Sequence, residues 1–466
     1  MAEWVERRKL TERKSANRNM IMTQSISGIL PSLDWLGKIA KQDKTLQYNN
    51  LLHHIDYELL SKAFYRLNRQ ASKGVDELSW YDYEKTLNYR LKNLHHRITS
   101  GVYKSKPVRR LWLEKANGEK RPIGVTAIED KIVQQAVMFV LEPIYEADFL
   151  GFSYGFRPNR NAHNALDAVH IAISQRKVSW VLDADLKGFF DNINHQWMMT
   201  FLEHRIADKR VLRLIKGWLK AGVVDGKVKY KTMTGTPQGA VISPLLANIY
   251  LHYVLDLWVN QWRKRHARGD VYIVRYADDF VIGFQYKSDG ATLKQQLNTR
   301  LAKFSLSVNE DKTHLIEFGR FAISSRRKRK QSKPETFNFL GFTHICSIKM
   351  LNGDFKLHRV SIKKNLRRKL KEIEERLMQT RHKSPYEVGR WVRSVLTGYF
   401  NYFAVPGNSA SIGIMRTEVC KAWLKAIRRR SQKGRGFNWK RMALLVRIFI
   451  PHTRVRHPYP NQRLCV

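Results

Sequence analysis

Two short apolar segments separated by only three residues constrain this chain more than any other feature. Residues 271–276 (VYIVRY) and 280–284 (FVIGF) both have the composition of buried β-strands. Ala277, Asp278 and Asp279, which lie between them, suit a tight turn. The pattern therefore predicts an antiparallel hairpin that carries two adjacent carboxylates at its tip.

A second apolar strand, expected over residues 178–182 (VSWVL), also runs directly into carboxylates, at Asp183 and Asp185. Enzymes that transfer nucleotidyl groups need such carboxylates, because two divalent cations ~4 Å apart can stabilise the attacking oxygen, the leaving oxygen and a triphosphate. Magnesium prefers oxygen ligands. Asp185, Asp278 and Asp279 are therefore candidate ligands. In the plainer interpretation, the hairpin pair is an exposed turn and Asp183 or Asp185 caps a helix.

The charge of the chain indicates a polyanionic partner. Its 466 residues, enough for about three domains, contain 84 Lys and Arg against 40 Asp and Glu, yet 43% are hydrophobic. This composition predicts a folded basic protein. A nucleic acid is favoured over a membrane, because no apolar run is long enough to span a bilayer. Residues 321–466 are the most basic part, with 34 Lys and Arg against 7 Asp and Glu.

The three cysteines, Cys346, Cys420 and Cys465, are too few and too scattered for a disulfide framework or a cysteine-based zinc site. The first residues lack the apolar core of a secretory signal. A cytoplasmic protein is therefore expected.

Hydrophobic periodicity predicts helices, and one dipeptide predicts a second hairpin. Asn117-Gly118 is a strong turn signal between residues 110–113 and 119–123. Residues 319–336 are polar and strongly basic, which predicts a solvated linker. The expected helices span residues 47–69, 82–98, 128–142, 162–176, 361–380, 385–403 and 415–430.

With these features in place, the chain resembles the reverse transcriptases encoded by group II introns, also called intron maturases, over nearly its whole length. The segments that carry the resemblance are 115–123 (KANGEKRPI), 155–158 (GFRP), 185–193 (DLKGFFDNI), 235–239 (GTPQG), 243–251 (SPLLANIYL), 276–279 (YADD), 306–313 (LSVNEDKT), 337–342 (FNFLGF) and 398–403 (GYFNYF). Among them, residues 276–279 match the hallmark tetrad of reverse transcriptases.

The resemblance implies a role for individual residues. Asp185, Asp278 and Asp279, with the backbone carbonyl of Leu186, would bind two Mg²⁺ ions, for which Mn²⁺ would substitute. Lys312 would protonate the pyrophosphate leaving group, although a solvated surface lysine is an equal alternative. The residues implied to contact the deoxynucleotide are Lys115, Arg121, Phe190, Gln238, Gly239 and Tyr276. Phe190 matches the aromatic that would clash with a ribose 2′-hydroxyl, and core packing is its plainer role.

The implied fold is α+β, a right-hand polymerase followed by a helical thumb. Its expected parts are an N-terminal extension (1–70), fingers and an antiparallel palm (71–342), a thumb or maturase domain (343–430) and a short basic segment (431–466) that binds DNA. Residues 337–342 resemble the primer grip and residues 398–403 the maturase domain, although the latter's aromatics would equally suit a core.

The implied function is RNA-directed DNA synthesis together with binding of the parent group II intron RNA to assist its splicing. The expected partners are that RNA, an RNA template with a DNA primer, and target DNA; the sequence predicts no oligomeric state. Basic side chains in the last third suit phosphate contacts. Those singled out for RNA are Arg367, Arg368, Arg428, Arg429 and Arg430. Residues 431–466 lack paired metal ligands, so no endonuclease is expected.

Three alternatives remain at this point. A retron or defence-type reverse transcriptase shares the palm but generally lacks the region resembled by residues 398–403. A non-catalytic maturase would retain the aspartates without using them. An RNA-dependent RNA polymerase uses similar carboxylates and is disfavoured by the bulk of Phe190 and by Ala277 in the tetrad.

Overall fold

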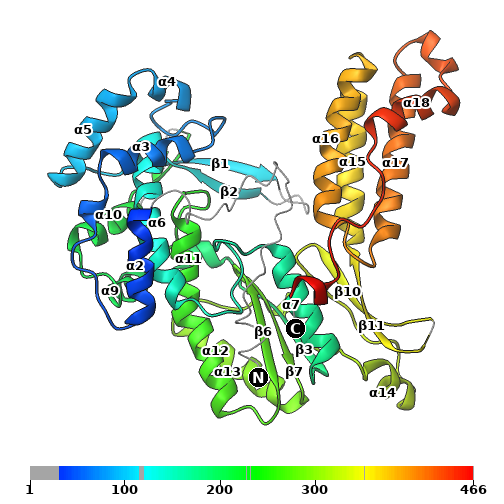
Figure 1. Ribbon diagram of the computed structural model, residues 1–466, viewed down its shortest axis with the longest axis horizontal. Coiled ribbons are helices and arrows are strands. Elements are labelled where there is room, and N and C mark those ends of the chain that lie inside the picture. Colours follow the sequence, from blue (N-terminus) through cyan, green and yellow to red (C-terminus); the bar gives the residue numbers. More distant parts are fainter. Residues whose placement is uncertain (1–30, 115–119, 227, 231, 351, 465–466) are drawn as a thin grey trace.

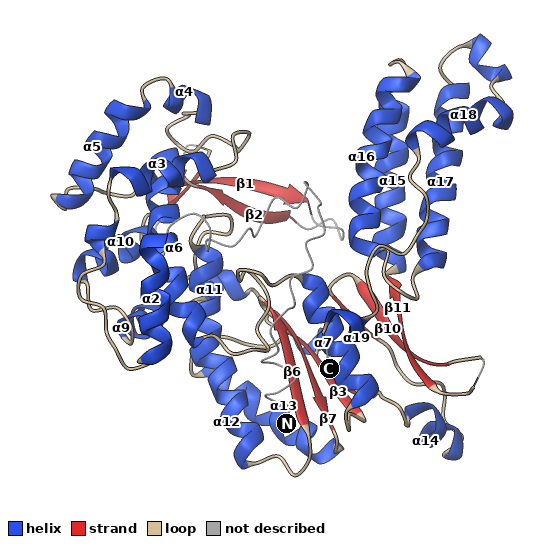
Figure 2. Cartoon of the chain, in the orientation of Figure 1, coloured by secondary structure: helices blue, strands red, loops and turns tan. Residues whose placement is uncertain are grey.

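The computed structural model describes residues 31–114, 120–226, 228–230, 232–350 and 352–464. Helices and three antiparallel or mixed sheets alternate along the chain, so the fold is α+β as expected. Figure 2 shows that the first two thirds of the chain place helices around the sheets. The last third of the chain forms a separate group of helices.

The central sheet has the strand order β6-β7-β3-β8 and is antiparallel throughout. Its strands are β3 (Trp180–Asp185), β6 (Val271–Tyr276), β7 (Asp279–Phe284) and β8 (His314–Glu317). The predicted hairpin is confirmed: β6 and β7 pair directly, and Ala277 and Asp278 form the turn. The expected strand at 178–182 starts two residues later and continues through Asp185.

The central strands β6 and β7 are buried on both faces, which is why they are apolar along most of their length. Side chains alternate between faces along a strand. Ile273 and Ile282 accordingly join the core of the N-terminal helices, whereas Val274 and Val281 join a second core with α7 (Ala162–Gln175). Helix α13 (Lys287–Ala302) contacts β3 and β7.

The N-terminal helices surround α6 (Ile128–Asp148), which is buried along most of its length. The single helix expected at 47–69 is wrong, because a 3₁₀ turn (Leu52–His54) precedes α3 (Tyr57–Arg66). The Asp56 carboxylate accepts a hydrogen bond from the Leu59 amide at 2.7 Å and so begins α3 as its N-cap. The helix expected at 82–98 is likewise divided. The remaining helices here are α2 (Pro31–Gln42), α4 (Trp80–Glu84), α5 (Leu87–Thr99), α9 (His195–Glu203) and α10 (Lys209–Leu219).

The second predicted hairpin is confirmed by β1 (Val108–Glu114) and β2 (Lys120–Val125), which pair antiparallel. Two short strands, β4 (Val223–Asp225) and β5 (Val228–Tyr230), extend it into a four-stranded sheet. The Asn117-Gly118 turn itself lies outside the described residues.

Between the sheets, a nearly continuous helical rod leads from α11 (Ser243–Leu251) through a π-helical segment (His252–Asp256) to α12 (Leu257–Arg265). Shorter helical elements nearby are α8 (Phe189–Asn192) and a 3₁₀ turn (Glu310–Lys312).

The last third forms what we call the helical arm, made of α15 (Lys363–Gln379), α16 (Pro385–Phe403), α17 (Ser409–Arg428) and α18 (Trp439–Phe449). These helices share one apolar core of their own, centred on the buried Trp423. A three-stranded sheet of β9 (Phe337–Phe339), β10 (Phe342–Ile348) and β11 (Phe355–Ser361) connects the arm to the central sheet. The three helices expected at 361–430 are confirmed to within a few residues at most boundaries.

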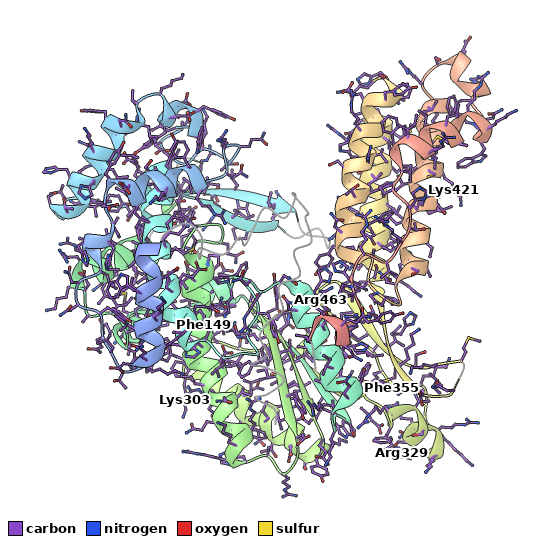
Figure 3. The ribbon with its side chains drawn as sticks, in the orientation of Figure 1. Phe149, Lys303, Arg329, Phe355, Lys421 and Arg463 are labelled. Carbon is purple, nitrogen blue, oxygen red and sulfur yellow. The ribbon has the colours of Figure 1, made fainter. Side chains whose placement is uncertain are left out.

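The basic segment 319–336 is not simply a solvated linker. It contains α14 (Ala322–Lys328), and both Arg326 and Arg329 form ion pairs with Glu317 of β8, so its charges have structural partners. Arg329 lies at the lower edge of the molecule in Figure 3.

The C-terminal residues return from the arm to the central part of the molecule. Helix α19 (Pro460–Arg463) packs against α7, and Arg463 lies there in Figure 3. Both described cysteines, Cys346 and Cys420, are buried free thiols. Within the described ranges, no helix combines the length and apolar character needed to cross a bilayer.

Candidate active site

The strand register brings two of the predicted aspartates face to face. Asp185, the last residue of β3, pairs with Asp279, the first residue of β7, and Asp279 pairs in turn with Tyr276 at the end of β6. Directly opposite residues on an antiparallel pair have Cβ atoms about 5 Å apart. Asp278 occupies the adjoining turn. The three carboxylates therefore gather at one end of the central sheet.

The electrostatics of this end of the sheet are dominated by burial and mutual repulsion of carboxylates. Burial first, and then repulsion from the neighbouring Asp183, Asp185 and Asp278, raise the pKa of Asp279 to about 8. A hydrogen bond from the Leu340 amide opposes these effects. Burial also raises the pKa of Asp183 to about 7. A group of crowded carboxylates of this kind is stabilised by nearby positive charge.

One positive charge at the site comes from Lys312, whose Nζ lies 2.7 Å from Oδ2 of Asp185. This hydrogen bond is the main reason why the pKa of Lys312 is raised, with Asp279 and Asp278 contributing. The backbone supports the same arrangement, since the Asn309 amide donates to the Asp185 carbonyl at 2.8 Å. The structure thus brings Lys312 together with the predicted aspartates.

The carboxylates fit a hard divalent cation by their donor chemistry, since all of them offer oxygen ligands. As placed, however, no three His, Cys, Asp or Glu side chains within the described ranges are already gathered closely enough to hold an ion. Lys312 bonds to one of the oxygens that an ion would use. Lys312 therefore occupies one of the two carboxylate oxygens of Asp185.

Asp279 is also connected to the helical arm through Leu340. The Leu340 amide donates to Asp279, and its carbonyl accepts a hydrogen bond from the Tyr402 hydroxyl at 2.9 Å. Leu340 and Gly341 both have positive φ, which forms the tight turn between β9 and β10. The segment that resembles a primer grip is therefore in contact with both the site and α16, and Tyr402 packs at this junction rather than facing solvent.

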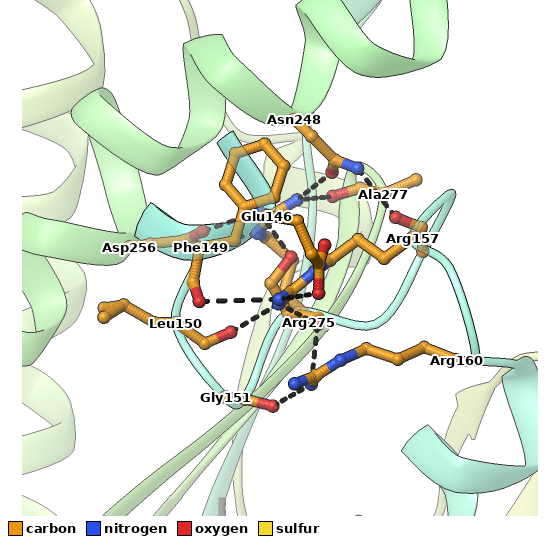
Figure 4. A network of polar contacts seen from close by, with 12 residues as sticks. Glu146, Phe149, Leu150, Gly151, Arg157, Arg160, Asn248, Asp256, Arg275 and Ala277 are labelled. Atoms are coloured by element: carbon orange, nitrogen blue, oxygen red, sulfur yellow. Dashed lines mark hydrogen bonds and ion pairs between the residues drawn. The ribbon is translucent and has the colours of Figure 1, made fainter. Parts of the chain in front are cut away.

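The turn between β6 and β7 is held by a residue that the sequence reading did not single out. Arg275, fully buried, forms a bidentate ion pair with Asp256 (2.7 and 2.6 Å) and donates to the Ala277 carbonyl at 2.9 Å. Figure 4 shows these contacts beside those of Arg157, which pairs with Glu146. The available signal was a charged residue inside an otherwise apolar strand.

On the other side of β3, the glycine loop before α11 lies against the basic hairpin. The Gln238 carbonyl accepts a hydrogen bond from the Gly124 amide at 2.7 Å, and a Cβ on Gly239 (φ +110°) would stand 2.9 Å from the Gly124 carbonyl oxygen. The Gln238 side chain donates to Asp191, one residue beyond the half-buried Phe190. This loop, the hairpin and the end of β3 thus line one region.

All six residues predicted to contact the nucleotide remain predictions, and the side chains of two of them are not described. Lys115 lies outside the described residues, and the side chain of Arg121 in β2 is not among those described. The Leu186 side chain is buried, and its backbone pairs with Val308. Tyr276 is half-buried, with its ring centroid 6.4 Å from that of Phe156.

The arginines predicted to bind RNA are exposed but do not form one cluster. Lys425 of α17 pairs with Glu374 of α15 at 2.7 Å. This contact lies near the C-terminal ends of both helices, so residues 428–430 lie close to the C-terminal end of α15. Arg367 and Arg368 lie near the N-terminal end of α15. Arg428 also donates to the Phe437 carbonyl at 2.7 Å.

Comparison with known proteins gives one family and a consistent set of relatives. The family described as reverse transcriptase (RNA-dependent DNA polymerase) matches residues 113–344, which include every element of the site except the arm. The Escherichia coli protein YkfC is 33% identical over 56% of this chain and 77% of its own length.

Two further relatives are intron-encoded. The group II intron-encoded protein LtrA of Lactococcus lactis is 35% identical over 51% of this chain and 40% of its own length. A putative COX1/OXI3 intron 1 protein of Saccharomyces cerevisiae is 31% identical over 57% of this chain and 37% of its own length. The chain therefore spans most of the first relative but two fifths or less of the intron-encoded ones.

Proposed function

Because this chain belongs to the reverse transcriptase family, whose members are RNA-dependent DNA polymerases, we propose that it extends a DNA primer along an RNA template. The observation that carries the proposal is the register that sets Asp185 opposite Asp279, with Asp278 in the adjoining turn. Carboxylates fixed at the ends of strands are the ligands that nucleotidyl transfer requires.

In the proposed reaction, the primer 3′-oxygen bonds to the α-phosphorus of a deoxynucleoside triphosphate, and the bond from that phosphorus to the bridging oxygen breaks to release pyrophosphate. Asp185, Asp278 and Asp279, with the Leu186 carbonyl, would hold two Mg²⁺ ions. Bound divalent cations would neutralise the triphosphate and stabilise the attacking and leaving oxygens. Lys312, which bonds to Asp185 in the structure, is proposed to give a proton to the leaving group.

The surrounding residues would select and orient the nucleotide. Lys115 and Arg121 of the basic hairpin are proposed to bind the triphosphate, and Gln238 and Gly239 bring backbone close to that hairpin. Phe190, at the start of α8 beyond Asp185, is proposed to exclude a ribose 2′-hydroxyl. Tyr276, which pairs with Asp279, would contact the same substrate.

The architecture suits a right-hand polymerase. In this proposal, the N-terminal helices from α4 onward and the β1–β2 hairpin form the fingers, the central sheet forms the palm, and helices α15, α16 and α17 of the helical arm form the thumb. The proposed boundaries are residues 71–342 for fingers and palm, 343–430 for the thumb, with flanking segments 1–70 and 431–466. The contact from Asp279 through Leu340 to Tyr402 connects palm and thumb at the position expected of a primer grip.

We propose further that the chain binds the RNA of a group II intron and assists its splicing and its insertion into target DNA. Two of the relatives are intron-encoded proteins, and the arm presents exposed arginines on α15 and at the end of α17. Exposed cations suit RNA phosphates, and such binding weakens steeply as salt is added.

The polymerase proposal is tested by primer extension with purified protein on an RNA template, with Mg²⁺ and either deoxynucleotides or ribonucleotides. We expect extension with deoxynucleotides only, and its loss in Asp279→Ala. Exposed Asp311, which lies on the nearby 3₁₀ turn, provides a matched control, because Asp311→Ala removes a carboxylate outside the strand ends. Absence of extension despite tight, salt-sensitive RNA binding would instead favour a non-catalytic maturase.

A further inference from the structure

Arg275 is a buried arginine whose donors are all used. Its side chain is fully inaccessible to solvent and pairs with Asp256 through Nε (2.7 Å) and Nη2 (2.6 Å). Nη1 donates to Asn248 at 3.1 Å and to the Ala277 carbonyl at 2.9 Å, while Nη2 also donates to the Ser153 hydroxyl at 2.7 Å. These five bonds match the five N–H groups of a guanidinium.

One of the five contacts reaches the turn that carries the site. Ala277 has φ +57°, a left-handed conformation that is costly for a residue other than glycine and persists only where its surroundings enforce it. Its carbonyl belongs to the peptide that leads into Asp278. Fixing that carbonyl therefore fixes the direction in which the backbone enters Asp278 and Asp279.

The other contacts anchor Arg275 to elements that do not belong to the hairpin. Asn248 lies on α11 and Asp256 at the end of the π-helical segment. In an ordinary α-helix, eight residues turn about 800° and leave two side chains roughly 80° apart. The wider π turn reduces this offset, so that both side chains reach the same guanidinium. The π segment thus has a specific geometric use here.

A second close approach constrains the same turn. Asn248 also donates to the Gly155 carbonyl at 2.8 Å, and a Cβ on Gly155 would stand 2.4 Å from the Ala277 amide nitrogen. Only glycine permits this approach. The Gly155 backbone and the Arg275 side chain therefore both contact this turn, and Figure 4 shows the contacts of Arg275.

We propose that Arg275 is a positioning residue: through its bonds to the Ala277 carbonyl, Asn248 and Asp256, it holds Asp278 and Asp279 in the arrangement that binds divalent cations. The inference rests on the proposed function and adds to it a residue that contacts neither substrate nor ion. Lysine at this position would keep the charge, but one ammonium group cannot pair with Asp256 in bidentate fashion and also reach Ala277.

The test compares Arg275→Lys with Arg205→Lys. Arg205 is also buried, pairs with Asp148 through Nε at 3.1 Å and donates to three backbone carbonyls, but it does so between α2 and α6, away from the turn. The two changes therefore remove similar bonds from similar depths. Primer extension is measured at a temperature where circular dichroism shows both variants folded.

We expect Arg275→Lys to lower kcat by about 10- to 100-fold, as loss of a group that orients metal ligands typically does, with KM for template–primer changed less than about threefold. Arg205→Lys should retain the kcat of the unchanged protein. Equal losses in both variants, or an undiminished kcat in Arg275→Lys, would overturn the proposal.

Mn²⁺ binding, followed by electron paramagnetic resonance without nucleotide, separates this inference from the polymerase proposal. We expect Arg275→Lys to weaken Mn²⁺ binding by about tenfold or more, and Arg205→Lys to leave it unchanged. If the unchanged protein extends no primer but the two variants still differ in Mn²⁺ affinity in this way, the polymerase proposal is contradicted and the positioning role of Arg275 is supported. Unaltered Mn²⁺ affinity in Arg275→Lys would contradict the positioning role alone.

Should Arg275→Lys fail to fold, Ser153→Ala removes a single acceptor and leaves the bidentate pair in place. The Ser153 hydroxyl is buried, so its loss leaves part of the guanidinium without a partner. We expect a smaller loss, about threefold, in both kcat and Mn²⁺ affinity. No change in either quantity would overturn the proposal.

Discussion

The Nζ atom of Lys312 lies 2.7 Å from Oδ2 of Asp185, one of the two oxygens that this carboxylate could offer a divalent cation. The lysine therefore competes with the cation while also supplying the proton donor of the proposed reaction. For Lys312→Met we expect two opposite effects: kcat for primer extension falls about 10- to 100-fold, and Mn²⁺ affinity rises. Steady-state kinetics and Mn²⁺ titration measure them separately. Lys303→Met, a change at an exposed lysine after α13, should alter neither. Falling Mn²⁺ affinity in Lys312→Met would contradict the competition.

Divalent cations should stabilise the fold through the same carboxylates. Burial and three neighbouring carboxylates make ionised Asp279 costly, and a bound cation offsets that repulsion. We expect 10 mM Mg²⁺ to raise the melting temperature of the unchanged protein, since a ligand that binds only the folded state stabilises it.

Asp279→Asn supplies the comparison, because it keeps the side-chain shape and removes the charge. This variant should be inactive in primer extension, and Mg²⁺ should hardly change its melting temperature. If Mg²⁺ raises the melting temperature of Asp279→Asn as much as that of the unchanged protein, the stabilising ion binds at a site that does not include Asp279.

Substitution of Phe190 should relax the choice of sugar. The half-buried ring is in edge-to-face contact with Phe189, at a centroid distance of 5.2 Å, at the start of α8. Phe190→Val removes the bulk proposed to meet a 2′-hydroxyl, so we expect the ratio of ribonucleotide to deoxynucleotide incorporation to rise by about tenfold or more. Single-nucleotide extension with each substrate measures the ratio. Phe189→Val, a core change beside it, should lower stability without changing the ratio.

The central sheet could be predicted because its sequence signals are local. Residues 271–284 contain two apolar runs and a turn, and the pairing of β6 with β7 follows from them. The register that sets Asp185 opposite Asp279 is different, since it joins residues 94 positions apart and depends on packing along whole strands. The chemistry of paired carboxylates made both residues candidate ligands of one site, but no local pattern predicts that they lie directly opposite each other.

Other features were missed because they depend on partners distant in sequence. Arg275 looks like an anomaly within an apolar strand until Asp256 is seen to come from a neighbouring helical rod. The basic segment 319–336 looked like a linker because composition does not show that Glu317 neutralises Arg326 and Arg329. The helix expected at 47–69 rests on hydrophobic periodicity alone, which does not register the N-cap at Asp56 where α3 begins.

The contact between α7 and the connection to the arm depends on a buried ion pair. Arg359 of β11 and Asp167 of α7, each 3% exposed, lie 3.0 Å apart, and Arg463 of α19 approaches the same carboxylate at 3.3 Å. Arg359→Met leaves the buried Asp167 carboxylate with Arg463 as its remaining partner, so it should lower the free energy of unfolding by about 3 kcal/mol, the low end for breaking a buried pair. Denaturant titration measures this loss.

An exposed pair on the arm provides the contrast. Lys421 and Glu418 lie 2.8 Å apart on the surface of α17, and Lys421→Met should cost less than about 1 kcal/mol. Similar losses for both variants would show that Arg359 contributes little through its charge.

Glu142, in the middle of α6, should make the stability of the protein depend on pH. Burial, helped by the neighbouring Glu146, raises the pKa of Glu142 from 4.5 to about 7. Between these two values the folded protein keeps a proton that the unfolded chain has released, so stability falls as pH rises from about 4.5 to about 7. The full shift corresponds to roughly 3 kcal/mol.

Glu142→Gln removes this titration and keeps the size of the side chain. We expect the variant to match the unchanged protein near pH 4.5 and to exceed it in free energy of unfolding by about 1–3 kcal/mol at pH 8. Denaturant titrations at both pH values measure the difference. Glu146→Gln should have the opposite sign at pH 8, because Glu146 pairs with the buried Arg157 at 2.6 Å. Parallel stability profiles for Glu142→Gln and the unchanged protein would mean that Glu142 ionises in the fold without the expected cost.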